Sequence, residues 1–225
     1  MPAIVFDLDG TLVDSAPDLH AAANATLADE GLAALSLATI ESYIGDGIDA
    51  LVARCLAPST KAPAKIAAAS ARFRRHYADR KHRGTTVYPG AAAALAQLKT
   101  SGHRLAVCTN KDEGFARDIL AATGLLASID IVVGGDTTGC QKPDPTPLLA
   151  CVRLCGKRPA GSLYIGDSEI DAETAAAAGI AFVLYEGGYR RYPGRPLRAR
   201  ASFQAFAILP EVIARLEEAI SREAT

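Results

Sequence analysis

The part of the chain after residue 85 alternates between short apolar segments and helical segments, and this alternation limits the fold more than any other feature. The apolar segments are predicted strands, at residues 104–109, 129–133, 162–165 and 180–184. Helical patterns flank them at residues 91–100, 113–123, 145–155, 170–178 and 210–222. Strands that are apolar throughout are typical of a parallel sheet buried on both faces. The pattern therefore predicts an α/β, Rossmann-like fold with helices on both faces of a parallel sheet.

The segment from residue 15 to residue 84 interrupts this alternation. It is rich in Ala and Leu at helical spacing and contains no convincing strand. Helices are expected near residues 17–34, 37–43, 48–57 and 62–80. We therefore predict an α/β core made of residues 1–14 and 85–225, with an inserted all-α domain at residues 15–84. A later stretch, residues 187–196, is rich in Gly, Arg, Tyr and Pro and is predicted to be a loop.

The N-terminal segment joins a short strand to two carboxylates. Ala3–Phe6 is apolar and β-prone, Asp7 and Asp9 follow it directly, and Gly10 permits a sharp turn. Two carboxylates at this spacing repel each other, and a divalent cation such as Mg2+ is the usual remedy. The plainer interpretation is a polar turn after a strand, where Asp and Gly are ordinary residues. Ligands of open α/β sheets bind beyond the carboxyl ends of the strands, which makes this turn a candidate site.

Polar residues also follow three other predicted strands. They are Thr109 and Asn110, then Lys142, then Asp167, Ser168 and Asp171. Each has an ordinary explanation of its own, as a helix cap, a loop cation, a turn residue or an exposed acid in a first helical turn. Their occurrence at successive strand ends is better explained by a shared site, because those ends lie on one edge of a parallel sheet. Together they supply the carboxylate nucleophile, cation and hydroxyl that phosphoryl transfer needs.

These motifs resemble a known family in their order and spacing. Asp7-x-Asp9-Gly-Thr, Thr109-Asn110, Lys142-Pro143 and Gly166-Asp167-Ser168-x-x-Asp171 resemble motifs one to four of the haloacid dehalogenase-like hydrolase superfamily. The helical insert after the first motif resembles the C1-type cap of that superfamily. Within it, Gly134-Gly-Asp, Lys142-Pro-Asp-Pro-x-Pro-Leu and Gly188-Tyr are most similar to phosphoglycolate phosphatases.

The resemblance implies a Mg2+-dependent phosphomonoesterase that works through an aspartyl phosphate, with 2-phosphoglycolate as the expected substrate. Asp7 would attack phosphorus. Asp9 would protonate the leaving alcohol and then deprotonate the hydrolytic water. Thr109 and the backbone of Asn110 would bind phosphoryl oxygens, and Lys142 would offset the charge of Asp7 and the phosphate.

The resemblance also implies a metal site. The Asp7 and Asp167 carboxylates and the backbone carbonyl of Asp9 would hold Mg2+. Asp171 and Ser168 would lie behind them and orient these ligands or Lys142.

Substrate specificity is expected from the helical insert. The loop that suits close approach to a substrate consists of Gly45, Asp46 and Gly47. A carboxylate on the substrate would also need a cation, and Arg54 is one candidate. The run of Arg72, Arg74 and Arg75 offers others, although a solvent-exposed helix face explains that run more simply.

Other functions remain as alternatives. Another phosphatase of the superfamily, acting on a sugar phosphate or pyrophosphate, or a phosphomutase would share all the core motifs. A receiver-type module that is phosphorylated on Asp also combines acidic residues, a Thr and a Lys. Receivers are much shorter, lack the insert, and carry the acceptor on a later strand than the acidic pair. Asp7 and Asp9 share one turn, which argues against that assignment.

Bulk properties exclude several classes of partner. The net charge is −1, which gives no indication of nucleic-acid or membrane-surface binding. No apolar run has the length of a membrane span, and no signal peptide is recognised. The five cysteines show no zinc spacing and are expected to be reduced thiols, so a cytoplasmic location is predicted. The expected partner is a small phosphomonoester, and the oligomeric state is left open between monomer and dimer.

Overall fold

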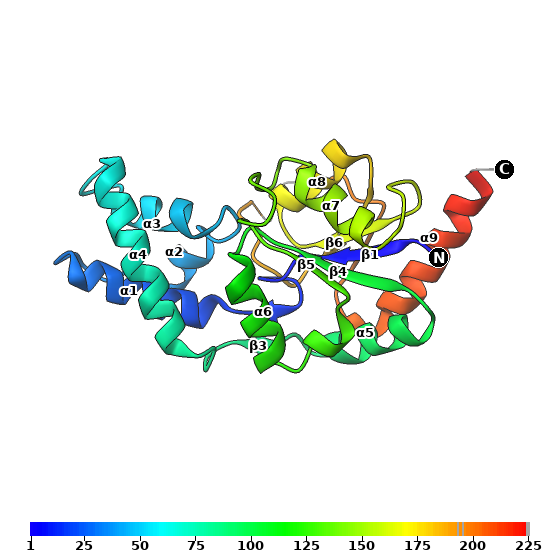
Figure 1. Ribbon diagram of the computed structural model, residues 1–225, viewed down its shortest axis with the longest axis horizontal. Helices are drawn as coiled ribbons and strands as arrows, with labels where there is room; N and C mark the ends of the chain where they lie inside the picture. The colour runs from blue at the N-terminus through cyan, green and yellow to red at the C-terminus, as the bar shows by residue number, and fades with distance from the viewer. Residues whose placement is uncertain (193, 195, 224–225) are drawn as a thin grey trace.

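The fold is organised around a six-stranded sheet, seen in a computed structural model that describes residues 1–192, 194 and 196–223 (Figure 1). In spatial order, the strands are β5 (Ile131–Val133), β4 (Arg104–Cys108), β1 (Ala3–Phe6), β6 (Leu163–Gly166), β7 (Ala181–Tyr185) and β8 (Ala201–Phe203). Every neighbouring pair is parallel. The predicted α/β class is confirmed. Residues 193 and 195 of the predicted loop lie outside the described part of the chain.

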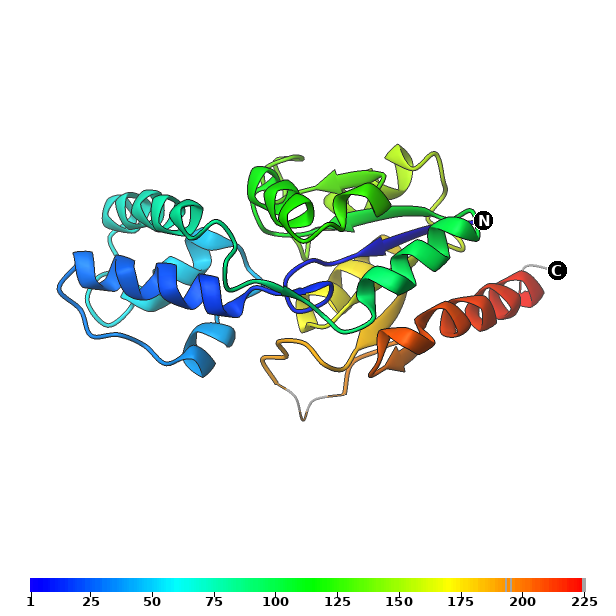
Figure 2. The same cartoon turned by 90° about the horizontal axis from the view of Figure 1, so that it is seen from below.

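Helices cover both faces of this sheet (Figures 1 and 2). They are α5 (Ala91–Thr100), α6 (Glu113–Ala122), α7 (Thr146–Leu154), α8 (Glu169–Ala178) and α9 (Leu209–Glu223). Helices α7 and α8 pack on one face, while α5, α6 and α9 pack on the other, and each face has its own apolar core. This arrangement follows from strands whose side chains point alternately to the two faces and are apolar in both directions.

Strand β1 is the central strand because both of its faces are fully buried. Its four side chains have 0% exposure, with Ile4 and Phe6 in one core and Ala3 and Val5 in the other. It pairs with β4 on one side and β6 on the other. Burial of an Ile or Phe side chain contributes about 1.5–3 kcal/mol to stability, so the strand that carries Asp7 and Asp9 is firmly held.

Two local features of the sheet escape the sequence patterns. Strand β8 has only three residues, and its single large apolar side chain, Phe203, packs against the rings of Tyr185 and Phe206. Strand β5 begins at Ile131, two residues later than expected, and follows a 3-10 turn, η1 (Leu126–Ser128). A second 3-10 turn, η2 (Phe206–Ile208), precedes α9. Short edge elements of this kind depend on packing more than on local propensity.

The remaining helices form a separate group at one end of the molecule, which we call the helical region (residues 16–80) (Figures 1 and 2). It contains α1 (Ala16–Asp29), α2 (Leu37–Glu41), α3 (Ile48–Leu56) and α4 (Pro63–Arg80). Helix α4 packs against α1 and α3. The absence of strands in this segment agrees with the sequence, and the position of the domain boundaries stays a prediction.

The chain enters and leaves the helical region through two adjacent segments. They form a short antiparallel pair, β2 (Val13–Asp14) with β3 (Thr86–Val87), which the sequence patterns did not reveal. Next to this pair, the fully buried carboxylate of Asp18 accepts hydrogen bonds from Arg80 Nε at 2.9 Å, Gly84 N at 2.9 Å and Thr85 Oγ1 at 2.8 Å. These contacts tie the beginning of α1 to the segment that returns from α4.

Two bulk predictions can be compared with the structure. Among the described residues, no helix has both the length and the apolar character needed to cross a membrane. All five cysteines lie in the described part and have free thiols, and Cys151 and Cys155 are buried in the core beneath α7.

Candidate active site

The carboxyl edge of the sheet brings together the polar residues that follow separate strands. Asp7 follows β1, Thr109 follows β4, and Asp167 follows β6. The register places Phe6 beside both Val107 and Ile165, so the three strands end side by side. The predicted convergence of these residues is therefore observed in the fold.

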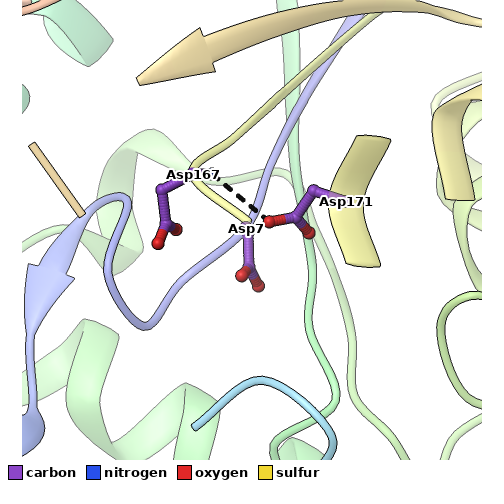
Figure 3. Close-up of side chains that lie close together, drawn as sticks. All are labelled: Asp7, Asp167 and Asp171. Atoms are coloured by element: carbon purple, nitrogen blue, oxygen red, sulfur yellow. Dashed lines mark hydrogen bonds between the residues drawn. The ribbon is translucent and has the colours of Figure 1, made fainter. Parts of the chain in front are cut away.

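Three carboxylates meet at this edge, as Figure 3 shows. Asp7, Asp167 and Asp171 are buried, and each offers an oxygen within 4.8 Å of the other two. The hydrogen bond drawn in Figure 3 joins the backbone N–H of Asp167 to Asp171 Oδ2, 3.3 Å apart. Such a concentration of buried negative charge is unfavourable unless cations offset it.

Lys142 is the side chain that supplies positive charge to this cluster. Its Nζ lies 2.9 Å from Asp7 Oδ1 and 2.7 Å from Asp171 Oδ1, and it donates a hydrogen bond to the Tyr164 hydroxyl at 2.9 Å. Burial alone would lower the pKa of Lys142, but the two carboxylates outweigh burial and raise that pKa. Lys142 is therefore held as a cation.

Asp171 is the best satisfied of the three acids. Its Oδ1 accepts from Lys142 and from the Tyr164 hydroxyl at 2.7 Å each, and its Oδ2 accepts from the Ser168 hydroxyl at 2.7 Å. Ser168 caps the N-terminus of α8 and forms a capping box with Asp171. Burial raises the pKa of Asp171, yet Lys142 outweighs burial and leaves the pKa below its ordinary value. Asp171 is thus held within the cluster by Lys142, Tyr164 and Ser168, and the expected role of Asp171 and Ser168 in orienting the metal ligands or Lys142 stays a prediction.

Asp7 and Asp167 are the two acids of the cluster whose pKa lies above its ordinary value. Burial, together with repulsion from Asp171, raises the pKa of Asp7 from 3.8 to about 7. Burial and repulsion from Asp171 and Asp7 also raise the pKa of Asp167, although Asp167 accepts hydrogen bonds from Thr11 Oγ1 at 2.6 Å and Tyr189 N at 2.7 Å. Asp7 Oδ1 is buried and lacks a partner in hydrogen-bonding geometry.

This donor set fits a divalent cation. The pKa values of Asp7 and Asp167 are raised, and Asp7 Oδ1 lacks a hydrogen-bond donor. Mg2+ binds carboxylate oxygens of this kind, and water or phosphate oxygens complete its coordination shell. Of the cluster, Asp7 and Asp167 suit the role of ligands better than Asp171, because both oxygens of Asp171 accept side-chain hydrogen bonds from Lys142, Tyr164 and Ser168.

The side chain of Asn110 has a structural task that the sequence did not suggest. It forms two hydrogen bonds with the backbone of Lys142, accepting from Lys142 N at 2.8 Å and donating to Lys142 O at 3.0 Å. The same amide donates to Gly45 O of the helical region at 2.9 Å. Asn110 therefore positions Lys142 and contacts the loop above it, which leaves its backbone and Thr109 beside the carboxylates.

Asp9 is not one of the three clustered carboxylates, and it contacts a residue that sequence reasoning missed. Its carboxylate accepts a very short hydrogen bond from Ser15 Oγ and lies 3.0 Å from the Nζ of Lys111. Lys111 is 5% exposed and also donates to the hydroxyl of Tyr77, on α4, at 3.1 Å. The only signal in the sequence is that Lys111 directly follows Thr109 and Asn110.

A cavity lies between the sheet edge and the helical region. The sheet edge contributes Asp7, Asp9, Thr109, Asn110 and Lys111, and the helical region contributes Leu19, Ile44, Gly45, Gly47, Ile48 and Leu51. Gly47 has a φ of 84°, and a Cβ there would lie 3.1 Å from Asn110 O. Glycine is therefore suited to this position, where the loop approaches the core.

The other two candidates of the helical region, Asp46 in this loop and Arg54 in α3, have different contacts. Asp46 and Arg54 form a close ion pair with each other, and neither lines the cavity. Asp46 also pairs with Arg191 of the core, whose Nη2 lies 2.6 Å from Asp46 Oδ2. These residues thus join the helical region to the segment after β7.

Comparisons with known proteins agree with this geometry. Residues 4–185 match the family described as haloacid dehalogenase-like hydrolase. A phosphoglycolate phosphatase of Cereibacter sphaeroides is 45% identical over 218 residues, covering 96% of this chain and 99% of that protein. A phosphoglycolate phosphatase of Rhodospirillum rubrum is 46% identical, covering 92% and 88% of the two chains. A crystal structure of a predicted phosphoglycolate phosphatase from Haemophilus somnus superposes with a TM-score of 0.87 at 30% identity, covering 94% and 97%.

Proposed function

The chain belongs to the haloacid dehalogenase-like hydrolase family, and from that starting point we propose that it is a Mg2+-dependent phosphomonoesterase that hydrolyses 2-phosphoglycolate to glycolate and phosphate. The observation that carries the proposal is the buried Asp7 carboxylate, which faces Lys142 at 2.9 Å and lines a cavity that it shares with Asp9. The names of the relatives at 45% and 46% identity support the choice of substrate.

In the first half-reaction, an oxygen of Asp7 attacks phosphorus. A bond forms between Asp7 and phosphorus as the bond to the leaving oxygen breaks, which gives an aspartyl phosphate and an alkoxide. Asp9 donates its proton to that alkoxide. Lys142 offsets the charge on Asp7 and the phosphoryl group, and the Thr109 hydroxyl donates to a phosphoryl oxygen.

In the second half-reaction, Asp9 takes a proton from a water molecule that attacks phosphorus. The bond from phosphorus to Asp7 breaks, inorganic phosphate leaves, and both carboxylates return to their initial states. A Mg2+ ion held by the Asp7 and Asp167 carboxylates and the Asp9 carbonyl would supply further positive charge for the phosphoryl oxygens. Asp171 and Ser168 keep Lys142 and the Asp167 turn in place.

We propose that the helical region belongs to a cap domain, residues 15–84, which covers a core made of residues 1–14 and 85–225. The paired segments β2 and β3 are the two connections about which it would move, and closure would exclude water while the aspartyl phosphate forms. A cytoplasmic location is part of the proposal, in keeping with five free thiols.

The test is a phosphate-release assay on a panel of small phosphomonoesters, with and without Mg2+. We expect turnover of 2-phosphoglycolate that depends on Mg2+ and is abolished by Asp7→Asn. The exposed Asp118→Asn, which makes the same chemical change on α6, is the matched control and should keep full activity. Near-normal turnover by Asp7→Asn would refute the nucleophile. Faster turnover of a sugar phosphate or pyrophosphate, or net phosphoryl transfer between sugar hydroxyls, would favour the alternatives named from the sequence.

A further inference from the structure

We propose that Lys111 binds the carboxylate of the leaving group and thereby selects phosphomonoesters of small hydroxy acids over uncharged ones. This inference rests on the proposed function, because it names the residue that reads the leaving group at the same site. Lys111 is not among the residues that the sequence motifs singled out, and it is found only when the cavity is assembled.

The first support is the position of Lys111 inside the site. Its Nζ lies 3.0 Å from Asp9 Oδ2, 3.1 Å from the Tyr77 hydroxyl and 4.7 Å from the centre of the Tyr77 ring. Tyr77 is fully buried and comes from α4, so the sheet edge and the helical region both hold this ammonium group. An ammonium has three N–H groups, and the contacts to Asp9 and Tyr77 use two. One N–H is left for a ligand.

The second support is the chemistry of the cavity wall. Among the described residues that line the cavity, Lys111 is the only cation. The part of the lining that comes from the helical region is largely apolar, with Leu19, Ile44, Ile48 and Leu51. A carboxylate that enters such a space loses its hydration and is tolerated only with a charged or hydrogen-bonding partner. Lys111 is the group that offers one.

The third support is the distance between Asp9 and Lys111. Asp9 is proposed to protonate the oxygen that leaves phosphorus. In glycolate, a single methylene separates that oxygen from the carboxylate. A leaving oxygen that faces Asp9 therefore brings its carboxylate next to the Lys111 ammonium, which is 3.0 Å from Asp9 Oδ2.

The arginines that the sequence suggested for this purpose are engaged elsewhere. Arg54 pairs with Asp46 and donates to Tyr43 O at 2.9 Å. Arg74 bridges Asp49 at 2.9 Å and Asp112 at 2.7 Å. Arg72 pairs closely with Glu30, and Arg75 is exposed. None of them lines the cavity within the described part of the chain.

The experiment compares two substrates that differ in the carboxylate alone. Ethyl phosphate has a methyl group where 2-phosphoglycolate has a carboxylate. A variant that displaces Asp9 should therefore slow the turnover of both substrates, whereas a variant that removes the partner of the carboxylate should slow the turnover of 2-phosphoglycolate alone. We expect Lys111→Met to lower kcat/KM for 2-phosphoglycolate about 10- to 100-fold more than for ethyl phosphate, because one charged hydrogen bond is removed. The excess loss should appear mainly as a higher KM.

Two further variants make the comparison robust. Lys111→Gln keeps a hydrogen-bond donor for Asp9 and Tyr77 without the charge, so it should lose the preference for 2-phosphoglycolate while lowering ethyl phosphate turnover less than Lys111→Met does. It serves the same comparison if Lys111→Met does not fold. Arg75→Met, an exposed position on α4, is the matched control and should leave both substrates unchanged.

The outcomes separate this inference from the proposed function. Equal losses on the two substrates in both Lys111 variants would overturn it and leave Lys111 as a positioning residue for Asp9. A wild-type enzyme that shows no preference for 2-phosphoglycolate would instead refute the proposed substrate, before any variant is measured.

Discussion

The charge imbalance at the carboxylate cluster predicts how the stability of the metal-free protein depends on pH. The pKa of Asp7 is raised from 3.8 to about 7 by burial and by Asp171. A carboxyl group with a raised pKa in the folded state holds its proton more tightly there than in the unfolded chain. Its contribution to stability is therefore complete below pH 3.8 and is lost as the pH rises toward 7.

The size of this effect follows from the same values. The folded state holds about one more proton on Asp7 than the unfolded state at pH 5 and about half a proton more at pH 7, and a full proton is worth about 1.4 kcal/mol per pH unit. The metal-free wild type should lose about 2 kcal/mol more of its free energy of unfolding over this range than Asp7→Asn. For a chain of this size, that corresponds to roughly 4–8 °C in Tm.

The assay is thermal and urea unfolding in EDTA at pH 5, 6 and 7, repeated with saturating Mg2+. Mg2+ favours the ionised carboxylates, so it should flatten the pH dependence and, at about 100 times its Kd, add about 3 kcal/mol at pH 7. Asp7→Asn should show little of either effect. Asp118→Asn, an exposed carboxylate outside the cluster, should follow the wild type in both.

Two results would refute this reasoning. One is a metal-free wild type whose stability changes with pH no more than that of Asp7→Asn, which would mean that the cluster is not strained by its charge. The other is equal stabilisation of the wild type and Asp7→Asn by Mg2+, which would place the ion elsewhere.

Three substitutions test contacts that hold the cluster and the helical region in place. Gly188→Ala would place a Cβ 2.4 Å from the Cβ of Asp167, so it should reduce phosphatase activity more than about 10-fold and weaken Mg2+ stabilisation; unchanged activity would contradict this close approach. Tyr164→Phe removes the hydroxyl that donates to Asp171 at 2.7 Å and should lower the free energy of unfolding in urea by about 1–3 kcal/mol, and no measurable change would count against it. Arg191→Ala breaks a half-exposed ion pair to the helical region, so it should alter stability by less than about 1 kcal/mol while raising KM; a larger loss of stability would show that the pair is structural.

The sheet and the carboxylates that follow its central strand could be predicted from the sequence because their signals are local. Ala3–Phe6 is apolar on both faces, and Asp7 and Asp9 follow within one turn, so strand, strand end and candidate site are all visible in nine residues. The strand–helix alternation then implies that strand ends meet, whatever the details of packing.

Other features depended on contacts between distant segments and could not be predicted. Strand β8 and the β2–β3 pair are two or three residues long, too short to carry a pattern of their own. The sequence motifs assigned a role only to the backbone of Asn110, as a phosphate ligand. The hydrogen bonds of its side chain to the backbone of Lys142, 32 residues away in the chain, were not expected.

The amino-acid sequence by itself determined the α/β class, the helical insert and the acids and lysine of the four motifs, because each is encoded within a few neighbouring residues. Only the tertiary structure decided which cation faces the cavity. The sequence suggested Arg54 and did not suggest Lys111, but Arg54 pairs with Asp46 while Lys111 is held between Asp9 and Tyr77. That choice depends on how α4 packs over the sheet edge, and packing between distant segments leaves no local pattern in the chain.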